Sequence, residues 1–261
     1  MMFLRRNSRL GVTISISSGL LFYLLAILFP DMDPHEAHLI SSSWPDIMKD
    51  LFGDPAFAFA DIYAWLHLQV FHITSWAIYG VYASILASRI VAREMEEKTL
   101  EILLSYPASR TSLLVSGTAG VHTLVLLGVI PGIIGCGLGI HSTDQEIHLL
   151  PIVLAGVECL LLSLVCASIA LLISTCGGGQ TLSICFSLAF ISFMFLHSQM
   201  LSTLEPMLGK LDFMSPFHYY RVDEILVDGV YDYAALLFMA VYSFIPMIVA
   251  FMVFSKKDIL V

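Results

Sequence analysis

The sequence has little charge. Only 13% of its 261 residues are Asp, Glu, Lys or Arg, against about a quarter in soluble globular domains, whereas 58% are hydrophobic. The mean hydropathy of +0.86 is typical of a chain that lies largely in a lipid bilayer. The composition therefore excludes an ordinary soluble domain and predicts an integral membrane protein.

Several motifs of enzymes and nucleotide-binding proteins are also missing. No Gly-Lys-Ser/Thr follows the glycine run 177–179, which excludes a phosphate-binding loop there. Gly-x-Ser-x-Gly, His-Glu-x-x-His and paired membrane aspartates do not occur, so an intramembrane hydrolase is not expected. The net charge of -9 gives no sign of a nucleic-acid partner. Five cysteines without a Cys-x-x-Cys pair lie in or beside apolar runs, as small core residues do: Cys136, Cys159, Cys166, Cys176 and Cys185.

Six apolar stretches are long enough to cross a bilayer, which takes about 20 residues. They lie near residues 11–29, 65–90, 111–140, 149–173, 180–200 and 234–254. The polar intervals between them are too short for a soluble catalytic domain. We therefore predict an all-α integral membrane protein with a single domain over residues 1–261. Its first helix is expected to stay uncleaved, because no small-residue cleavage site follows it.

Cations gather on one side of the predicted membrane. Only Lys49, Lys210 and Arg221 lie on the other side, out of 12 Lys and Arg residues in all. The rest are near the chain ends and in the loop between spans two and three: Arg5, Arg6, Arg9, Arg89, Arg93, Lys98, Arg110, Lys256 and Lys257. Because the cation-rich side is usually cytoplasmic, we expect a multi-pass plasma-membrane protein with both termini in the cytoplasm.

The segment 93–107 is strongly charged and lies between two apolar runs. At about 100° per residue, its polar side chains share one helical stripe and its apolar ones cover most of the rest. The stripe comprises Glu94, Glu97, Lys98 and Glu101, and the apolar set comprises Met95, Leu100, Ile102, Leu103 and Leu104. Glu96 interrupts the apolar side, where a lone carboxylate is costly. A helix in the headgroup layer and a helix that docks on a protein are the alternatives, and the interrupted face favours docking.

Residues at the end of this segment indicate where one helix ends and the next begins. Pro107 ends the predicted helix, and Ser109 or Thr111 can cap the next one. The pattern Arg-Glu-x-Glu-x-x-Thr-x-Glu-x-Leu-Leu-x-x-Pro-x-Ser-Arg over residues 93–110 resembles the cytoplasmic loop between spans two and three of ABC-2 type permeases. The chain departs from that family at Lys98, where glycine is frequent, and at Gly117-Thr118, where Gly-Lys is frequent.

The resemblance implies that the segment is a coupling helix, which seats in a groove of an ATPase subunit. The residues expected to carry this contact are Glu94, Glu96, Glu97, Thr99, Leu100, Glu101, Leu103, Leu104 and Pro107. The partner ATPase would bind ATP and Mg, while this chain would bind no cofactor and catalyse no reaction. A second permease copy or a paralogue would complete the pair in the lipid bilayer.

The expected function is thus that of a permease subunit that couples ATP hydrolysis to substrate movement, with export as the expected direction. The alternative is a non-transporting membrane scaffold or a maturation-factor subunit, including a copper-site assembly permease. The sequence near residues 103–107 also resembles that of a copper-site assembly permease. A non-transporting scaffold would leave the coupling-helix pattern unexplained.

Two further groups of residues are candidates for function. Glu158 is an acid inside a predicted span, about 13 Å from its outer end, and His122 on the preceding span is its nearest expected partner. A transport-path role and a structural role for Glu158 both remain open. The run Asp31-Met32-Asp33-Pro34-His35-Glu36-Ala37-His38 puts carboxylates and two imidazoles just outside the first span, a set that could hold a cation. It is one residue short of the His-Glu-x-x-His zinc motif, and Pro34 is expected to interrupt any helix that would align both histidines. We therefore predict a hydrated acidic loop and no metal site.

Overall fold

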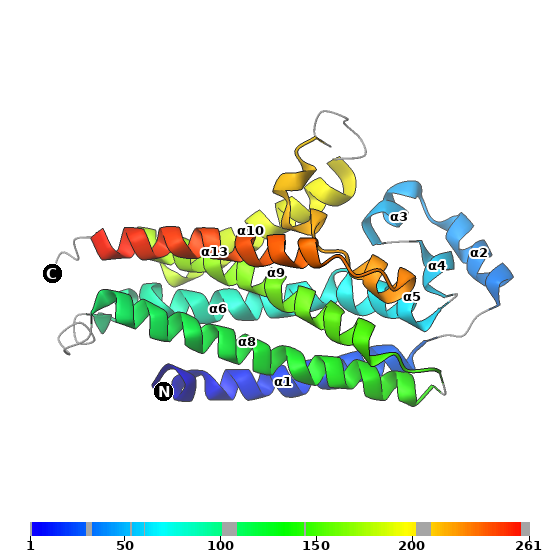
Figure 1. Ribbon diagram of the computed structural model, residues 1–261, viewed down its shortest axis with the longest axis horizontal. Helices are drawn as coiled ribbons and strands as arrows, with labels where there is room; N and C mark the ends of the chain where they lie inside the picture. Colours follow the sequence, from blue (N-terminus) through cyan, green and yellow to red (C-terminus); the bar gives the residue numbers. More distant parts are fainter. Residues whose placement is uncertain are drawn as a thin grey trace.

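The computed structural model describes residues 2–29, 33–52, 54–59, 61–100, 109–143, 145–201 and 210–256. These residues form a bundle of long helices and contain no strand. Helix α1 (Met2–Ile27) begins and helix α13 (Tyr233–Lys256) ends at the same end of the bundle, here called the near end (Figure 1). The opposite end, here called the far end, carries the short helices α2 to α5.

Six described segments are long and apolar enough to span a membrane, which confirms the predicted count. They are Phe3–Ile27, Ile62–Glu96, Arg110–His141, Leu149–Cys176, Gln180–Gln199 and Tyr233–Lys256. Each predicted stretch falls almost wholly within one of these segments. The agreement follows from composition, because continuous apolar runs of this length have few other stable environments.

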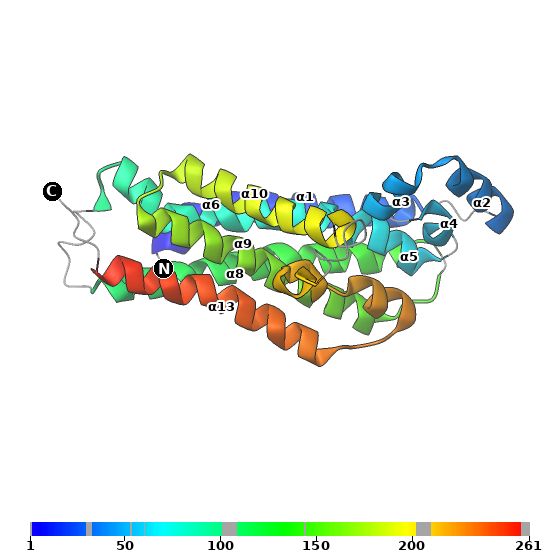
Figure 2. The ribbon, with the colours of Figure 1, turned by 90° about the horizontal axis from the view of Figure 1, so that it is seen from above.

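The long helices alternate in direction along the bundle. They are α1 (Met2–Ile27), α6 (Thr74–Glu96), α8 (Arg110–His141), α9 (Leu149–Cys176), α10 (Gln180–Leu196) and α13 (Tyr233–Lys256). Helix α1 packs mainly on α8, and α9 contacts α6, α10 and α13. Figure 2 shows α9 between α10 and α13. Many of its side chains are buried, so α9 is the central helix of the bundle.

The far end holds the shorter elements. Between the first two spans lie α2 (Pro34–Ser43), α3 (Asp46–Phe52) and α4 (Pro55–Ala58), followed by α5 (Ile62–Leu66). Between α10 and α13 the described chain forms two 3₁₀ turns, η3 (Asp212–Met214) and η4 (Pro216–His218). Three π-helical segments also lie here: η1 (His67–Phe71), η2 (His197–Leu201) and η5 (Glu224–Asp228).

Close approach of α1 and α8 depends on glycine. A β-carbon added at Gly135 would collide with the carbonyl oxygen of Gly19, and one at Gly139 would collide with Ala26. The two backbones therefore lie as near as packed membrane helices do when small residues face each other. This contact joins α1 to α8 along much of their length.

Candidate functional site

Helix α6 continues beyond the predicted second span as far as Glu96. Glu94 and Glu96 therefore belong to the last turn of α6, and the prediction of a separate helix beginning at Arg93 is wrong at its start. Glu97 and Lys98 form a turn, and Lys98 has a φ of 55°. This left-handed conformation is favoured by glycine, the residue that the resembling family often has at this position.

The chain after the turn is held against α6. The backbone N–H of Thr99 donates to the carbonyl oxygen of Glu94 at 2.9 Å, and the Thr99 hydroxyl donates to the Glu94 carboxylate. Leu100 is 3% exposed and lies in the hydrophobic core. It therefore packs inside this chain instead of on an open face of the predicted helix.

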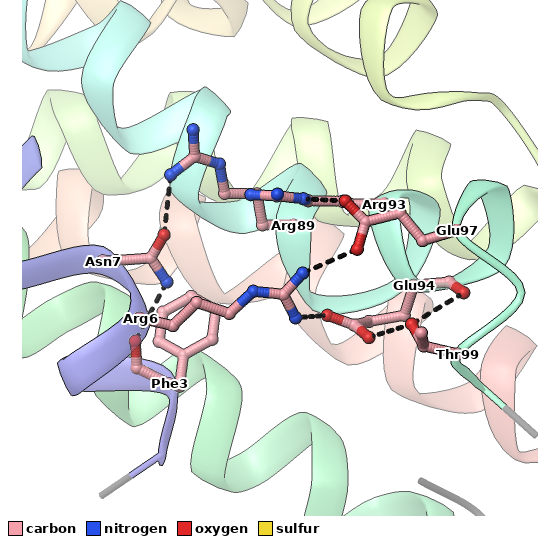
Figure 3. Close-up of polar contacts among 8 residues, drawn as sticks. All are labelled: Phe3, Arg6, Asn7, Arg89, Arg93, Glu94, Glu97 and Thr99. Carbon is pink, nitrogen blue, oxygen red and sulfur yellow. Dashed lines mark hydrogen bonds and ion pairs between the residues drawn. The ribbon is translucent and has the colours of Figure 1, made fainter. Parts of the chain in front are cut away.

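A cluster of polar side chains, here called the junction, joins α1 to the end of α6. It consists of Arg6, Asn7, Arg89, Arg93, Glu94, Glu97 and Thr99 (Figure 3). Arg6 reaches from α1 to Glu94 and Glu97, with 2.7 Å between Arg6 Nη2 and Glu97 Oε2. Glu94 is only 6% exposed, and a buried carboxylate is costly without such a partner.

The junction is continuous on the α1 side. Arg89 Nη1 donates to Asn7 Oδ1 at 2.7 Å, and Asn7 Nδ2 donates to the Phe3 carbonyl oxygen at 3.0 Å. Asn7 itself is 2% exposed. The first turns of α1 are therefore fixed to α6 by an amide as well as by ion pairs.

Glu97 lies at the exposed side of the junction. Arg93 Nε donates to Glu97 Oε1 at 2.6 Å, and this hydrogen bond, together with Arg6, lowers the pKa of Glu97. The carboxylate is therefore charged at neutral pH and holds Arg6 and Arg93 together. Arg6 belongs to α1 and Arg93 to α6, so Glu97 bridges the two helices.

Glu96 faces another helix of the same chain. Its Oε1 accepts a hydrogen bond from the backbone N–H of Gln180 at 2.8 Å, at the first residue of α10. A carboxylate stabilises this end of a helix, where N–H groups lack partners. Glu96 thus caps α10, which differs from the expected projection from an apolar docking face.

The remaining predicted coupling residues lie outside the described part of the chain: Glu101, Leu103, Leu104 and Pro107. The structure resumes at Ser109. The Ser109 side chain accepts a hydrogen bond from the backbone N–H of Ser112 at 3.1 Å and caps α8, as predicted. The described chain therefore leads into and out of the predicted coupling segment at the near end.

Glu158 is buried within α9, with 1% of its surface exposed. Its Oε2 has no hydrogen-bond partner among the described residues, and the backbone of Arg221 lies close to the carboxylate. Asp223 and Glu224 are also close enough to act on it electrostatically. The carboxylate therefore faces the segment that precedes α13.

His122 lies elsewhere in the bundle, so the expected pairing with Glu158 is not found. Its Nδ1 lies 2.7 Å from the carbonyl oxygen of Thr118. It borders a cavity of about 10 Å³ whose α9 residues begin at Leu164. Glu158 is six residues, about 9 Å, farther along α9 toward the far end.

The acidic segment after α1 forms a helix where we predicted a hydrated loop. Pro34 is the first residue of α2, and Asp33 caps it by accepting from the His35 backbone N–H at 2.8 Å. Proline suits this position because the missing N–H would have had no helical partner. Within the described residues, no three His, Cys, Asp or Glu side chains are grouped to hold a metal ion.

Sequence reasoning missed three residues of the junction: Arg6, Asn7 and Arg89. Arg6 and Arg89 were read only as part of the charge asymmetry. The contacts between α1 and α6 join residues more than 80 positions apart, so no local spacing indicates them. The signal available was an Asn within an otherwise basic first turn, too weak to identify a buried amide.

The comparisons with known proteins agree with this architecture. A family model described as ABC-2 family transporter protein matches residues 34–259. A search among curated proteins gave no match. With six spans and a match over most of its length, the chain belongs to the ABC-2 transporter family, whose membrane proteins are the permease subunits of ABC transporters and have an ABC ATPase as partner.

Proposed function

We propose that this permease couples ATP hydrolysis on a separate ATPase subunit to export of a substrate across the plasma membrane. The observation that carries the proposal is the junction. Arg6 pins α1 to the last turn of α6, directly before the segment that resembles a coupling helix. A force applied to that segment would therefore reach both helices at once.

The packing supports transmission from the segment into the bundle. Thr99 ties the chain after the turn to Glu94, and Leu100 is buried in the core. From there, α6 contacts α9, while α1 contacts α8. Packed helices shift as rigid bodies, so movement of an ATPase against this end would rotate or translate two helix pairs together.

The proposed orientation places the near end in the cytoplasm. The near end carries Arg5, Arg6, Arg9, Arg93 and Lys98, whereas the described far end carries Lys49, Lys210 and Arg221. An excess of cations on one side is the usual mark of a cytoplasmic face. ATP and Mg would be bound there by the ATPase subunit, outside this chain.

A second permease copy or a paralogue would complete the transporter. Helix α13 supports this, because many of its large apolar side chains are exposed in the single chain and require lipid or a protein partner. Glu158 is the proposed polar group of the transport path. Burial of a carboxylate with an unpaired oxygen destabilises the fold, and an ionisable residue inside a membrane span is usually there for a function. His122 is a second path residue at a different depth.

The proposal predicts that Arg6→Ala uncouples the transporter. Loss of Arg6 leaves Glu94 buried beside Thr99 alone, which costs about 1–3 kcal/mol and loosens α1 from α6. We expect substrate-stimulated ATP hydrolysis of the purified complex to fall about fivefold or more. Arg9→Ala, an exposed cation on the same helix, is the matched control and should leave the rate unchanged.

Copurification separates the possible results. Retention of the ATPase together with a lowered rate would support transmission through the junction. An unchanged rate in Arg6→Ala would refute it. A complex that hydrolyses ATP without moving any substrate would instead favour the non-transporting scaffold.

A further inference from the structure

The far end contains a polar cavity of about 420 Å³ between α3, the residues that precede α6, the end of α10 and the segment before α13. All three π-helical segments of the described chain contribute to its wall. His67 comes from η1, Gln199 from η2 and Glu224 from η5. π-Helical turns are rare and occur frequently at functional sites, so their convergence on one cavity indicates a binding site.

Rings form one side of this cavity, here called the far-end pocket. The ring centroids of His67 and His72 are 5.4 Å apart, and those of His72 and Phe195 are 5.5 Å apart. Phe217 continues the row, with its centroid 5.2 Å from that of Phe195. The rings meet edge to face, and their faces can pack against alkyl groups or, for the phenylalanines, against a cation.

Two polar atoms at the pocket are buried without hydrogen-bond partners. One is His67 Nδ1, and the other is Asp212 Oδ1, which lies 3.9 Å from His197 Nδ1, beyond hydrogen-bond distance. The other oxygen of Asp212 lies 2.8 Å from His218 Nδ1, so the carboxylate is fixed in place. A buried carboxylate oxygen in this position lacks a donor, and a ligand with N–H groups would supply one.

The charges of the lining also favour a cation. Three acids, Asp212, Asp223 and Glu224, face two cations, Lys49 and Arg221. Arg221 is already engaged, at 3.2 Å from Glu224 and 3.8 Å from Asp232. Asp212 and Asp223 are therefore left without a guanidinium partner, and the ion pairs of Asp212 in the described chain are with the imidazoles of His218 and His197.

We propose that the far-end pocket binds an organic ammonium ion, of the aliphatic amine or diamine class. Its N–H groups would donate to Asp212 and Asp223, and its alkyl chain would pack on the rings. A metal ion fits less well, because no three donor side chains in the described ranges are grouped around a single point. The pocket is separate from the junction, so this proposal does not depend on the coupling mechanism.

The test is isothermal titration of the purified full-length permease with putrescine, a four-carbon diamine. We expect saturable binding of putrescine and none of 1,4-butanediol, which has hydroxyls in place of ammonium groups. Asp223→Asn and Asp212→Asn should each weaken binding at least about tenfold, because each removes a charge-assisted hydrogen bond. Asp228→Asn, on η5 but outside the pocket lining, is the matched control and should bind like the original protein.

Asp223→Asn guards against misfolding, since Asp223 is exposed whereas Asp212 holds His218. The proposal is overturned by a lack of saturable putrescine binding, or by equal affinity in both pocket variants and the original protein. Zinc chloride provides a further arm. Saturable zinc binding that both variants abolish, without putrescine binding, would make the pocket a metal site and contradict the proposal.

Discussion

Lys98 lies in the turn directly after α6, within the predicted coupling segment. Its φ of 55° is unusual for a residue with a side chain, because the β-carbon then approaches the backbone carbonyl. The sequence departs from the resembling family at this position, and the structure gives the physical meaning of that departure. A glycine would make the same turn without the steric cost.

Lys98→Gly should therefore stabilise the protein by about 0.5–1 kcal/mol, which corresponds to a rise of about 1–4 °C in the unfolding temperature. Lys98→Ala is the matched control, since it removes the charge but keeps the β-carbon. We expect no gain from it. Equal unfolding temperatures for the two variants in detergent would show that the backbone conformation is not the cause.

Glu158 can be tested by separating its shape from its charge. Glu158→Gln keeps the size of the side chain and replaces the carboxylate by a neutral amide. If Glu158 belongs to the transport path, this variant should reduce transport into reconstituted vesicles severalfold while the complex remains assembled, and Glu158→Leu should reduce it further. Full transport by both variants would leave Glu158 with a structural role alone.

At the scale of elements, the contact between α1 and α8 depends on backbone proximity. Gly135→Ala should destabilise the protein by about 1–3 kcal/mol, because the new β-carbon meets the Gly19 carbonyl oxygen, which cannot rotate away. Gly137→Ala is the control, since its β-carbon would meet only Leu149 at an ordinary 3.8 Å. A thermal unfolding series in which the two variants match would contradict the close packing described here.

Some of these helices and contacts could be predicted from the sequence, and others could not. The six spans were predictable because each long apolar run fits only a bilayer or a buried core. The end of α6 was not, because periodicity continues smoothly through Glu96 while the backbone turns at Lys98. The burial of Glu94 depends on Arg6, 88 residues earlier, and its cause is tertiary. Helix α2 was not predicted, because proline interrupts a helix at interior positions. It suits the first helical position, where Pro34 lies.

For the whole molecule, the features proposed to have a function lie at the two ends of the bundle. The near end carries the junction and the segment proposed to meet the ATPase, and the far end carries the polar pocket and three π-helical segments. Glu158 lies in the half of α9 nearer the far end, beside the segment that also borders the far-end pocket. The long helices connect these regions, so movement at one end can change the other.

The central claim is that the segment after α6 contacts an ATPase. The most direct measurement is site-specific photo-crosslinking in the assembled complex, with the photoreactive residue placed at position 103 or, as a control, at Ile47 on α3 at the far end. We predict a crosslinked product with the ATPase from position 103 and none from Ile47. A complex that copurifies intact but gives no ATPase product from position 103, or gives one from Ile47, would contradict the account.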